Sequence, residues 1–275
     1  MTIAAAYLVS EGVVLGADST TSILLPADKG SGVNQLLNHT QKVFEVGENS
    51  NFGVCTWGAG SIGEVSHRTI IAQLADKIRE IKDITVEKAA NELLNLSFDL
   101  LKKSGTDFVG YYLGGCDPIT HMPGCYKIEI NQKNGTKEAF PIGQCVFSGM
   151  PNFFTRVFYG FDPGLPLNLV KEIKSLSKDD KFNIKLDEIF DTAFKNAYAP
   201  LIAEGYKDLP IREAIDFVYS YLHLTIKAMK FMFGAPGCGG PIEIGFITTD
   251  RKFRWAVHKS FTTAMHEQEG GNYVG

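Results

Sequence analysis

The sequence has no cluster of basic residues and no long apolar run, and both absences exclude classes of function. Its 275 residues include 27 Lys and Arg against 31 Asp and Glu, a net charge of −4 without blocks of like charge. Nucleic acids and anionic membranes bind clustered positive charge, so neither is an expected partner. The apolar run Ile3 to Val9 is far shorter than the roughly 20 residues of a membrane-spanning helix. It has no basic segment before it, so a signal peptide is not expected, and we expect a cytoplasmic protein.

Cysteine patterns that bind metals or exchange electrons are also missing. The cysteines form no CxxC pair and no cluster with His at metal-ligand spacing. An odd number of cysteines without an export signal indicates reduced thiols that pack as small apolar side chains. We expect no metal and no organic cofactor. The five are Cys55, Cys116, Cys125, Cys145 and Cys238.

Familiar catalytic and nucleotide-binding motifs are absent as well. There is no P-loop, no HExxH and no GxSxG, and the six histidines are scattered, so a His-based triad is not supported. Gly58, Gly60 and Gly63 have GxGxxG spacing. They lack the following strand with a terminal acid that a dinucleotide-binding unit requires, so nucleotide binding is not expected.

The periodicity of apolar residues predicts strands and helices in separate runs, which favours an α+β fold rather than alternating βαβ units. We expect a helix directly after Gly60, because Ser61 and Glu64 have capping-box spacing, and a second helix with Thr85 as N-cap. The stretch 26–39 is polar and is expected to be a loop. Strands are predicted at 3–9, 13–17, 41–46, 52–56, 108–115, 125–131, 145–147, 242–249 and 253–257, and further helices at 152–159, 186–206 and 211–232.

Three residues near the start of the chain suggest a site that needs no histidine. Thr2 precedes the first predicted strand, Asp18 follows the second, and Lys42 lies at the start of the third. If Met1 is removed, Thr2 carries a hydroxyl beside a free α-amino group, which can act as the general base for that hydroxyl. A buried lysine held by an aspartate would tune both groups through its charge. Each residue alone is weak evidence, since each has an ordinary structural explanation.

Together these residues belong to a longer pattern. The sequence resembles the β-type subunits of the proteasome core and their bacterial relatives, including the Anbu group, within the N-terminal nucleophile hydrolases. The resemblance covers most of the chain. It is carried by Thr2-Ile3-Ala4, the segment from Gly12 to Ser19 that ends in Gly-Ala-Asp-Ser, Gln41-Lys42-Val43, Gly58-Ala59-Gly60, Tyr112 to Gly115 with Tyr126-Lys127-Ile128, Phe147-Ser148-Gly149, and Gly239 to Ile244.

The resemblance implies a four-layer αββα sandwich and a threonine-type peptidase. It makes Thr2 the nucleophile, Asp18 and Lys42 its charge pair, and the Gly60 amide an oxyanion donor, and it matches Ser148 to the family serine near the amine. An extended substrate would pair between Thr21 and the segment 58–60. The implied primary pocket has an apolar, uncharged lining, so we expect an apolar residue at the cleaved bond. The matched pocket positions are Thr40, Phe44, Gly58, Ile62 and Ser66.

The sequence departs from the family pattern in three places, one of which is the longer loop 26–39. The loop 234–240 has no acid where the family has an aspartate, and the stretch 162–210 is longer than the family needs. We therefore expect one domain, 1–275, with a helical insertion around 162–210. A homo-oligomeric ring or stacked rings, with a polypeptide substrate, is implied by the resemblance. Two alternatives stay open: a catalytically silent structural subunit that keeps Met1, and an amidase that uses the same nucleophile on small molecules.

Overall fold

The computed structural model describes residues 2–24, 33–149, 156, 164–176, 206–231 and 237–259. This part of the chain is a mixed α+β fold with two five-stranded antiparallel sheets, so the predicted fold class is confirmed at that level. None of its helices combines the length and apolar character that a bilayer crossing requires.

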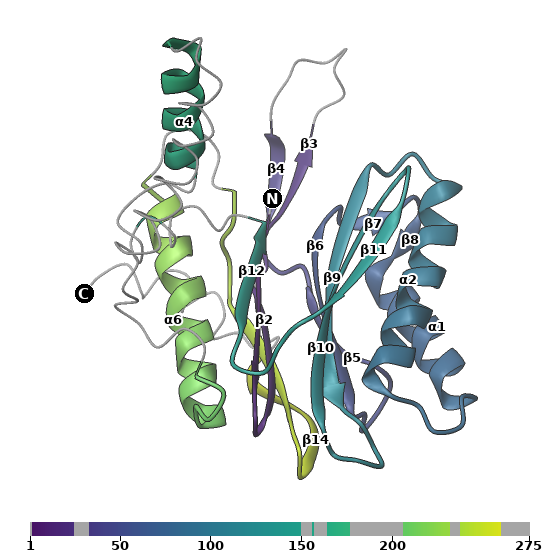
Figure 1. Ribbon diagram of the computed structural model, residues 1–275. Coiled ribbons are helices and arrows are strands. Elements are labelled where there is room, and N and C mark those ends of the chain that lie inside the picture. The colour runs from purple at the N-terminus through teal and green to yellow at the C-terminus, as the bar shows by residue number, and fades with distance from the viewer. Residues whose placement is uncertain are drawn as a thin grey trace.

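The first large sheet has the strand order β12-β1-β2-β13-β14 (Figure 1). The predicted hairpin at the start of the chain is present, with Ala4 opposite Ala17 and Val9 opposite Gly12. The predicted closing hairpin is also present and pairs with β2. The strands are β1 (Ile3–Val9), β2 (Gly12–Ala17), β12 (Cys145–Gly149), β13 (Glu243–Thr248) and β14 (Arg251–Val257).

The second large sheet has the order β11-β10-β9-β6-β5. A tight connection joins β10 to β11 at the predicted place, but it consists of residues 132–134, and Gly135 is already the first residue of β11, opposite Ile130. The strands are β5 (Val43–Glu45), β6 (Phe52–Gly58), β9 (Phe108–Cys116), β10 (Pro123–Asn131) and β11 (Gly135–Ala139). Two small pairs complete the strands, β3 (Thr21–Leu24) with β4 (Val33–Leu37) and β7 (Ser61–Ile62) with β8 (Val65–Ser66).

Helices cover the outer faces of both large sheets, and the sheets face each other (Figure 1). Apolar side chains of α1 (His67–Arg79) and α2 (Val86–Lys102) pack on the second sheet, and those of α6 (Ile211–Met229) pack on the first. A third core cluster, which includes Leu15, Trp57 and Tyr112, fills the space between the sheets. A further helix, α4 (Gly164–Leu176), lies within the stretch expected to be an insertion.

The start of α1 differs from the sequence prediction. The helix begins at His67, and the side chain of Ser66 accepts a hydrogen bond from the Thr69 amide as its N-cap. The Ser61–Glu64 capping box does not form, because Gly63 has a φ of +58° and turns the chain into the short β7–β8 hairpin. The prediction for α2 is confirmed, since the Thr85 side chain caps the Lys88 amide.

The predicted loop 26–39 is also partly wrong, because β4 lies within it and pairs antiparallel with β3, with Thr21 opposite Leu37. The helix predicted at 152–159 falls outside the described residues apart from Arg156, and the one at 186–206 falls outside them apart from Tyr206. The five cysteines are free and buried, as expected.

Candidate active site

The antiparallel pairing of β1 with β2 brings the start of the chain to the end of the second strand. Thr2 precedes β1 and Asp18 follows β2, and the Asp18 amide donates to the Ile3 carbonyl at 3.2 Å. In the other sheet Lys42 precedes β5, and its carbonyl accepts a hydrogen bond from the Thr56 amide at 2.9 Å. Residues that lie far apart in the sequence therefore meet where strands of both sheets end.

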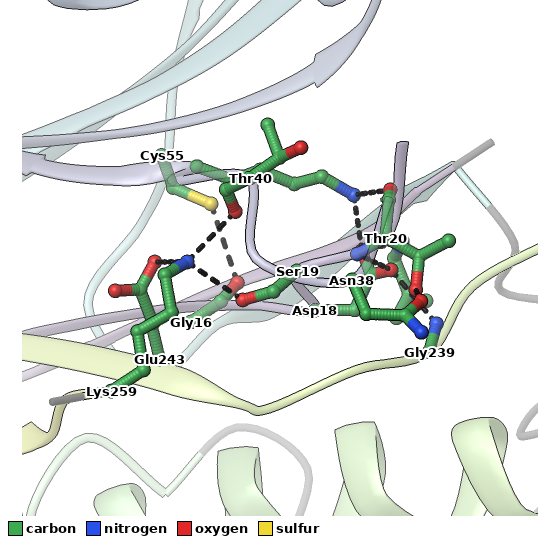
Figure 2. A network of polar contacts seen from close by, with 12 residues as sticks. Gly16, Asp18, Ser19, Thr20, Asn38, Thr40, Cys55, Gly239, Glu243 and Lys259 are labelled. Atoms are coloured by element: carbon green, nitrogen blue, oxygen red, sulfur yellow. Dashed lines mark hydrogen bonds and ion pairs between the residues drawn. The ribbon is translucent and has the colours of Figure 1, made fainter. Parts of the chain in front are cut away.

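The carboxylate of Asp18 is fully buried and accepts four hydrogen bonds (Figure 2). Oδ1 accepts from the Ile3 amide at 3.0 Å and from Lys42 Nζ at 2.7 Å. Oδ2 accepts from the Thr20 amide at 3.1 Å and from the Gly239 amide at 2.9 Å. A buried charge is costly unless it is paired and hydrogen-bonded, and here both conditions hold.

Lys42 carries the opposite charge of this pair and is itself buried, with 4% of its surface exposed. Besides Asp18, its ammonium donates to the Thr20 carbonyl. Both contacts come from the segment that follows β2, so the lysine joins the ends of the two large sheets. The pair thus fixes the position of a cation beside the start of the chain.

A cavity of about 270 Å³ opens over this pair. Among its lining residues Lys42 is the one with a permanent charge, while most others have hydroxyl or amide groups or are small. Trp57 is the largest apolar side chain among them. The lining consists of Thr2, Thr21, Ser22, Thr40, Gln41, Lys42, Thr56, Trp57, Gly58, Ala59, Gly60 and His67.

One wall of the cavity is the segment from Gly58 to Gly60. Gly58 has a φ of +90°, and a Cβ there would lie 3.0 Å from the Phe108 carbonyl oxygen, so this turn requires glycine. A Cβ on Gly60 would lie 3.7 Å from Cγ2 of Thr21, an ordinary contact. Thr21 and Gly60 are therefore neighbours in the cavity lining, and the narrow slot between them has room for a methyl group.

His67 supports the same wall from the start of α1. Its Nε2 lies 2.8 Å from the Ala59 carbonyl oxygen and its Nδ1 lies 3.1 Å from the Tyr111 hydroxyl. Burial lowers the pKa of His67, more strongly than the Ala59 hydrogen bond raises it. Because a carbonyl only accepts, the neutral ring donates through Nε2 and accepts the tyrosine proton at Nδ1. The histidine thereby ties the cavity wall to β9.

Ser148 lies behind Thr2 rather than in the cavity lining. It is buried, opposite Ala4 in the β1–β12 register, and its Oγ lies 2.6 Å from the Tyr112 hydroxyl. The next residue, Gly149, packs against the Thr2 backbone so closely that a Cβ would lie 1.8 Å from the Thr2 carbonyl oxygen. This close approach holds the first residues of β1 against β12.

The structure brings together part of the set that the resemblance assigned. Thr2, Thr21, Thr40, Lys42, Gly58 and Gly60 line one cavity, and Asp18 contacts Lys42. Three expected pocket residues lie outside that lining. Phe44 and Ile62 are buried in the core beneath α1 and α2, and Ser66 caps α1. The cavity lining therefore lacks Phe44 and Ile62, the two large apolar side chains on which the expectation of an apolar pocket chiefly depended.

Sequence reasoning missed four lining residues, Ser22, Thr56, Trp57 and His67, and it included Gln41 and Ala59 only as members of longer motifs. Most of them are neighbours of predicted positions, so widening each motif by one or two residues would have found them. His67 directly follows the predicted pocket position Ser66, but its contacts with Ala59 and Tyr111, 8 and 44 positions away along the chain, have no sequence signal. Within the described ranges no group of three or more His, Cys, Asp or Glu side chains is arranged to hold a metal ion.

The loop without an acid also reaches the site, through its backbone. Gly239 donates to Asp18 through its amide, and its carbonyl accepts from the Ser19 amide at 3.0 Å. The only sequence signal for this contact is the glycine pair after Cys238. A backbone group thus contacts Asp18 from the loop in which the family pattern has an acid.

Comparison with known proteins gives a fold but no sequence family. No family model matches the chain, and no curated protein matches its sequence. Among solved structures, a (Gly-1) mutant of Anbu from Hyphomicrobium sp. strain MC1 matches with a TM-score of 0.56 and 11% sequence identity. The match covers 99% of this chain and 93% of that chain. The fold is therefore similar to that of Anbu.

Proposed function

We propose that this chain is an N-terminal threonine hydrolase that cleaves peptide bonds, related to the β-type proteasome subunits and their bacterial relatives. The observation that carries the proposal is a single cavity lined by Thr2, Lys42 and Gly60, with Asp18 bonded to Lys42 at 2.7 Å. The likeness of fold to Anbu supports the same relationship. On this proposal the layers are the αββα sandwich of N-terminal nucleophile hydrolases, in one domain with an insertion at 162–210.

The proposed reaction begins when Met1 is removed and the α-amino group of Thr2 becomes free. The neutral amine takes the hydroxyl proton as Thr2 Oγ forms a bond to the substrate carbonyl carbon. The Gly60 amide donates to the oxyanion that develops, a contact worth about 2.7–4 kcal/mol in other hydrolases. The ammonium then protonates the leaving amine as the C–N bond breaks, which leaves an ester on Thr2.

Water completes the cycle by attacking this ester, with the Thr2 amine again accepting a proton. The carboxylic acid leaves, and the proton returns to Thr2 Oγ. Throughout, the Lys42 ammonium disfavours protonation of the nearby amine by like-charge repulsion and stabilises negative charge near the hydroxyl. Asp18 keeps that ammonium in place. The buried Ser148 is the serine that the resemblance places near the Thr2 amine.

The proposed assembly is a homo-oligomer that encloses its active sites. Leu165 and Leu169 lie one turn apart on α4 and are 46% and 40% exposed, a pair of apolar side chains suited to burial between subunits. Light scattering coupled to size exclusion tests this part of the proposal, since a monomer at every concentration would contradict it.

The activity is tested with fluorogenic peptide amides and the variants Thr2→Ala and Thr2→Ser. The wild type should hydrolyse peptides, Thr2→Ala should have no activity above background, and Thr2→Ser should retain part of it because it keeps a hydroxyl. Equal activity in the wild type and Thr2→Ala would refute the mechanism. An inactive wild type that retains Met1 would favour the silent subunit. A burst on a small amide without peptide cleavage would favour the amidase.

A further inference from the structure

We infer that Lys259 is a positioning residue for the Thr2 site, because its ammonium joins the segment after Asp18 to the segment before Lys42. The inference rests on the proposed function, since the site it serves is the proposed hydrolytic site. Lys259 lies just after β14, more than 200 positions along the chain from both residues that it would position.

The three donors of the Lys259 ammonium each have a partner (Figure 2). Nζ donates to Ser19 Oγ at 2.9 Å and to the Thr40 carbonyl at 2.9 Å, and it lies 3.0 Å from Glu243 Oε2. An ammonium has three donors and no acceptor, so this set uses its full capacity. The side chain is 9% exposed and therefore works largely out of water.

The two segments that Lys259 contacts lead directly to the proposed catalytic pair. Ser19 follows Asp18, and Thr40 lies two residues before Lys42 and lines the cavity. A backbone hydrogen bond of 2.9 Å from the Thr40 amide to the Ser19 carbonyl already joins them. The lysine adds a second connection at the same junction, through side-chain donors rather than backbone groups.

Glu243 holds Lys259 in this position. Its carboxylate is fully buried, opposite Ala17 in the β2–β13 register. Within the described structure its contacts are the Lys259 ammonium, 3.0 Å from Oε2, and the His258 ring, whose Nδ1 lies 3.0 Å from Oε1, and no backbone amide donates to either oxygen. The carboxylate thus depends on the segment after β14, and it fixes that segment in return.

Stability alone does not account for this second buried pair. The pKa of Lys259 is lowered, because burial and, to a smaller extent, the Lys42 cation together lower it more than Glu243 and Asp18 raise it. Uncharged side chains of similar size would fill such a site at no greater cost. What they could not do is hold Ser19 Oγ and the Thr40 carbonyl together.

The test measures the rate at which a peptide vinyl sulfone labels Thr2, resolved into noncovalent binding (KI) and the covalent step (kinact). The variants are Lys259→Met, which keeps the length of the side chain, and the double variant Glu243→Gln/Lys259→Met, which leaves no unpaired carboxylate. Lys252→Met is the matched control, because Lys252 is an exposed lysine on the same strand, β14. Folding of each variant is checked by circular dichroism and urea unfolding.

We expect Lys259→Met to lower kinact by about tenfold or more, as small displacements of reacting groups do, with KI unchanged within about threefold. The charged groups around Lys259 are Glu243, Asp18 and Lys42, and the titratable ring of His258 contacts the same Glu243 carboxylate. Loss of its cation removes a positive charge beside the site and leaves the Glu243 carboxylate without its ammonium partner, so the Thr2 amine should be easier to protonate and the acid limb of the pH–kinact profile should move to higher pH. The double variant should restore the acid limb but not the rate.

Failure of the positioning role and failure of the proposed function give different results in this experiment. If the wild type and Lys252→Met are labelled at Thr2, and both Lys259 variants fold and are labelled within twofold of the wild-type rate with the same pH profile, the positioning role is wrong while the proposed function stands. If the wild type itself is not labelled at Thr2, the proposed function fails, and the positioning role fails with it.

Discussion

The two buried ion pairs beside the cavity differ in what holds their carboxylates. Asp18 accepts from three backbone amides, those of Ile3, Thr20 and Gly239, in addition to Lys42. Glu243 is equally buried, yet within the described structure its contacts are the side chains of two consecutive residues after β14.

The difference separates a charge fixed by the fold from one fixed by a single segment. Backbone amides from three parts of the chain remain around Asp18 whatever happens to Lys42. Glu243 has no such reserve, so its environment changes if the segment after β14 moves. We therefore expect the Asp18–Lys42 pair to matter more for chemistry and the Glu243–Lys259 pair to matter more for stability.

The largest expected effect is on catalysis. Lys42→Met should lower kcat/KM for peptide amides by about 10²–10³-fold, because it removes the charge that stabilises the reacting hydroxyl, whereas Lys259→Met should cost about tenfold. Parallel steady-state assays of the two variants measure this ranking. A larger loss in Lys259→Met would reverse the roles assigned to the two pairs.

Stability should show the opposite ranking. Lys259→Met leaves a buried carboxylate without a backbone donor and should lower the free energy of unfolding by about 3–5 kcal/mol. Lys42→Met leaves Asp18 with three amide donors and should cost about 1–3 kcal/mol. Urea unfolding of both variants at pH 7.5 compares them. An equal loss in the free energy of unfolding of both variants would show that the backbone amides around Asp18 do not stabilise its charge once Lys42 is gone.

Two glycines of the cavity wall allow effects on catalysis to be separated from effects on stability. Gly60→Ala adds a methyl group that contacts Thr21 at an ordinary distance, so it should narrow the slot and slow peptide cleavage by about tenfold or more with stability unchanged or raised by about 0.4–1 kcal/mol. Gly58→Ala is the contrasting control, because its positive φ and the nearby Phe108 carbonyl predict a loss of stability. Thermal melts with peptide assays separate the two effects, and a Gly60→Ala enzyme as active as the wild type would exclude substrate from this slot.

The smallest expected effect comes from His67. Its pKa is lowered in the folded protein, so the unfolded chain takes up the proton first as pH falls below 6.5, and the part of the stability due to this group is lost toward the folded pKa. His67→Gln keeps a donor for the Ala59 carbonyl without a titrating ring. The free energy of unfolding, measured at several pH values between 7.5 and 5, should therefore fall less with decreasing pH in the variant than in the wild type. Identical slopes in the two proteins would contradict the titration of His67 in this range.

The sequence predicts the outer framework of the fold better than the boundaries inside it. Apolar periodicity identifies the two hairpins of the first sheet and the helix α2, because each is governed by local alternation or by a cap such as Thr85. The start of α1 was missed because Ser61 and Glu64 have the spacing of a capping box, but the positive φ of Gly63 between them prevents a helix from starting there. The strand β4 was missed because it is stabilised by backbone hydrogen bonds to β3, and a polar sequence without apolar alternation gives no sign of that pairing.

The site divides in the same way. Thr2, Asp18 and Lys42 follow from their places at the ends of predicted strands, since antiparallel pairing brings such ends together. The contacts of His67, Gly239 and Lys259 could not be predicted, because each joins parts of the chain that are distant in sequence. The pocket positions Phe44 and Ile62 were matched by motif alone, and burial places both in the core.

The central claim is that Thr2 becomes a free N-terminal nucleophile, and the mass of the mature protein tests it most directly. Intact-mass analysis of the purified wild type, before and after reaction with a peptide vinyl sulfone, should show loss of Met1 and the addition of one label. Peptide mapping should then locate that label on Thr2. Retention of Met1, or the same labelling in Thr2→Ala, would contradict the account.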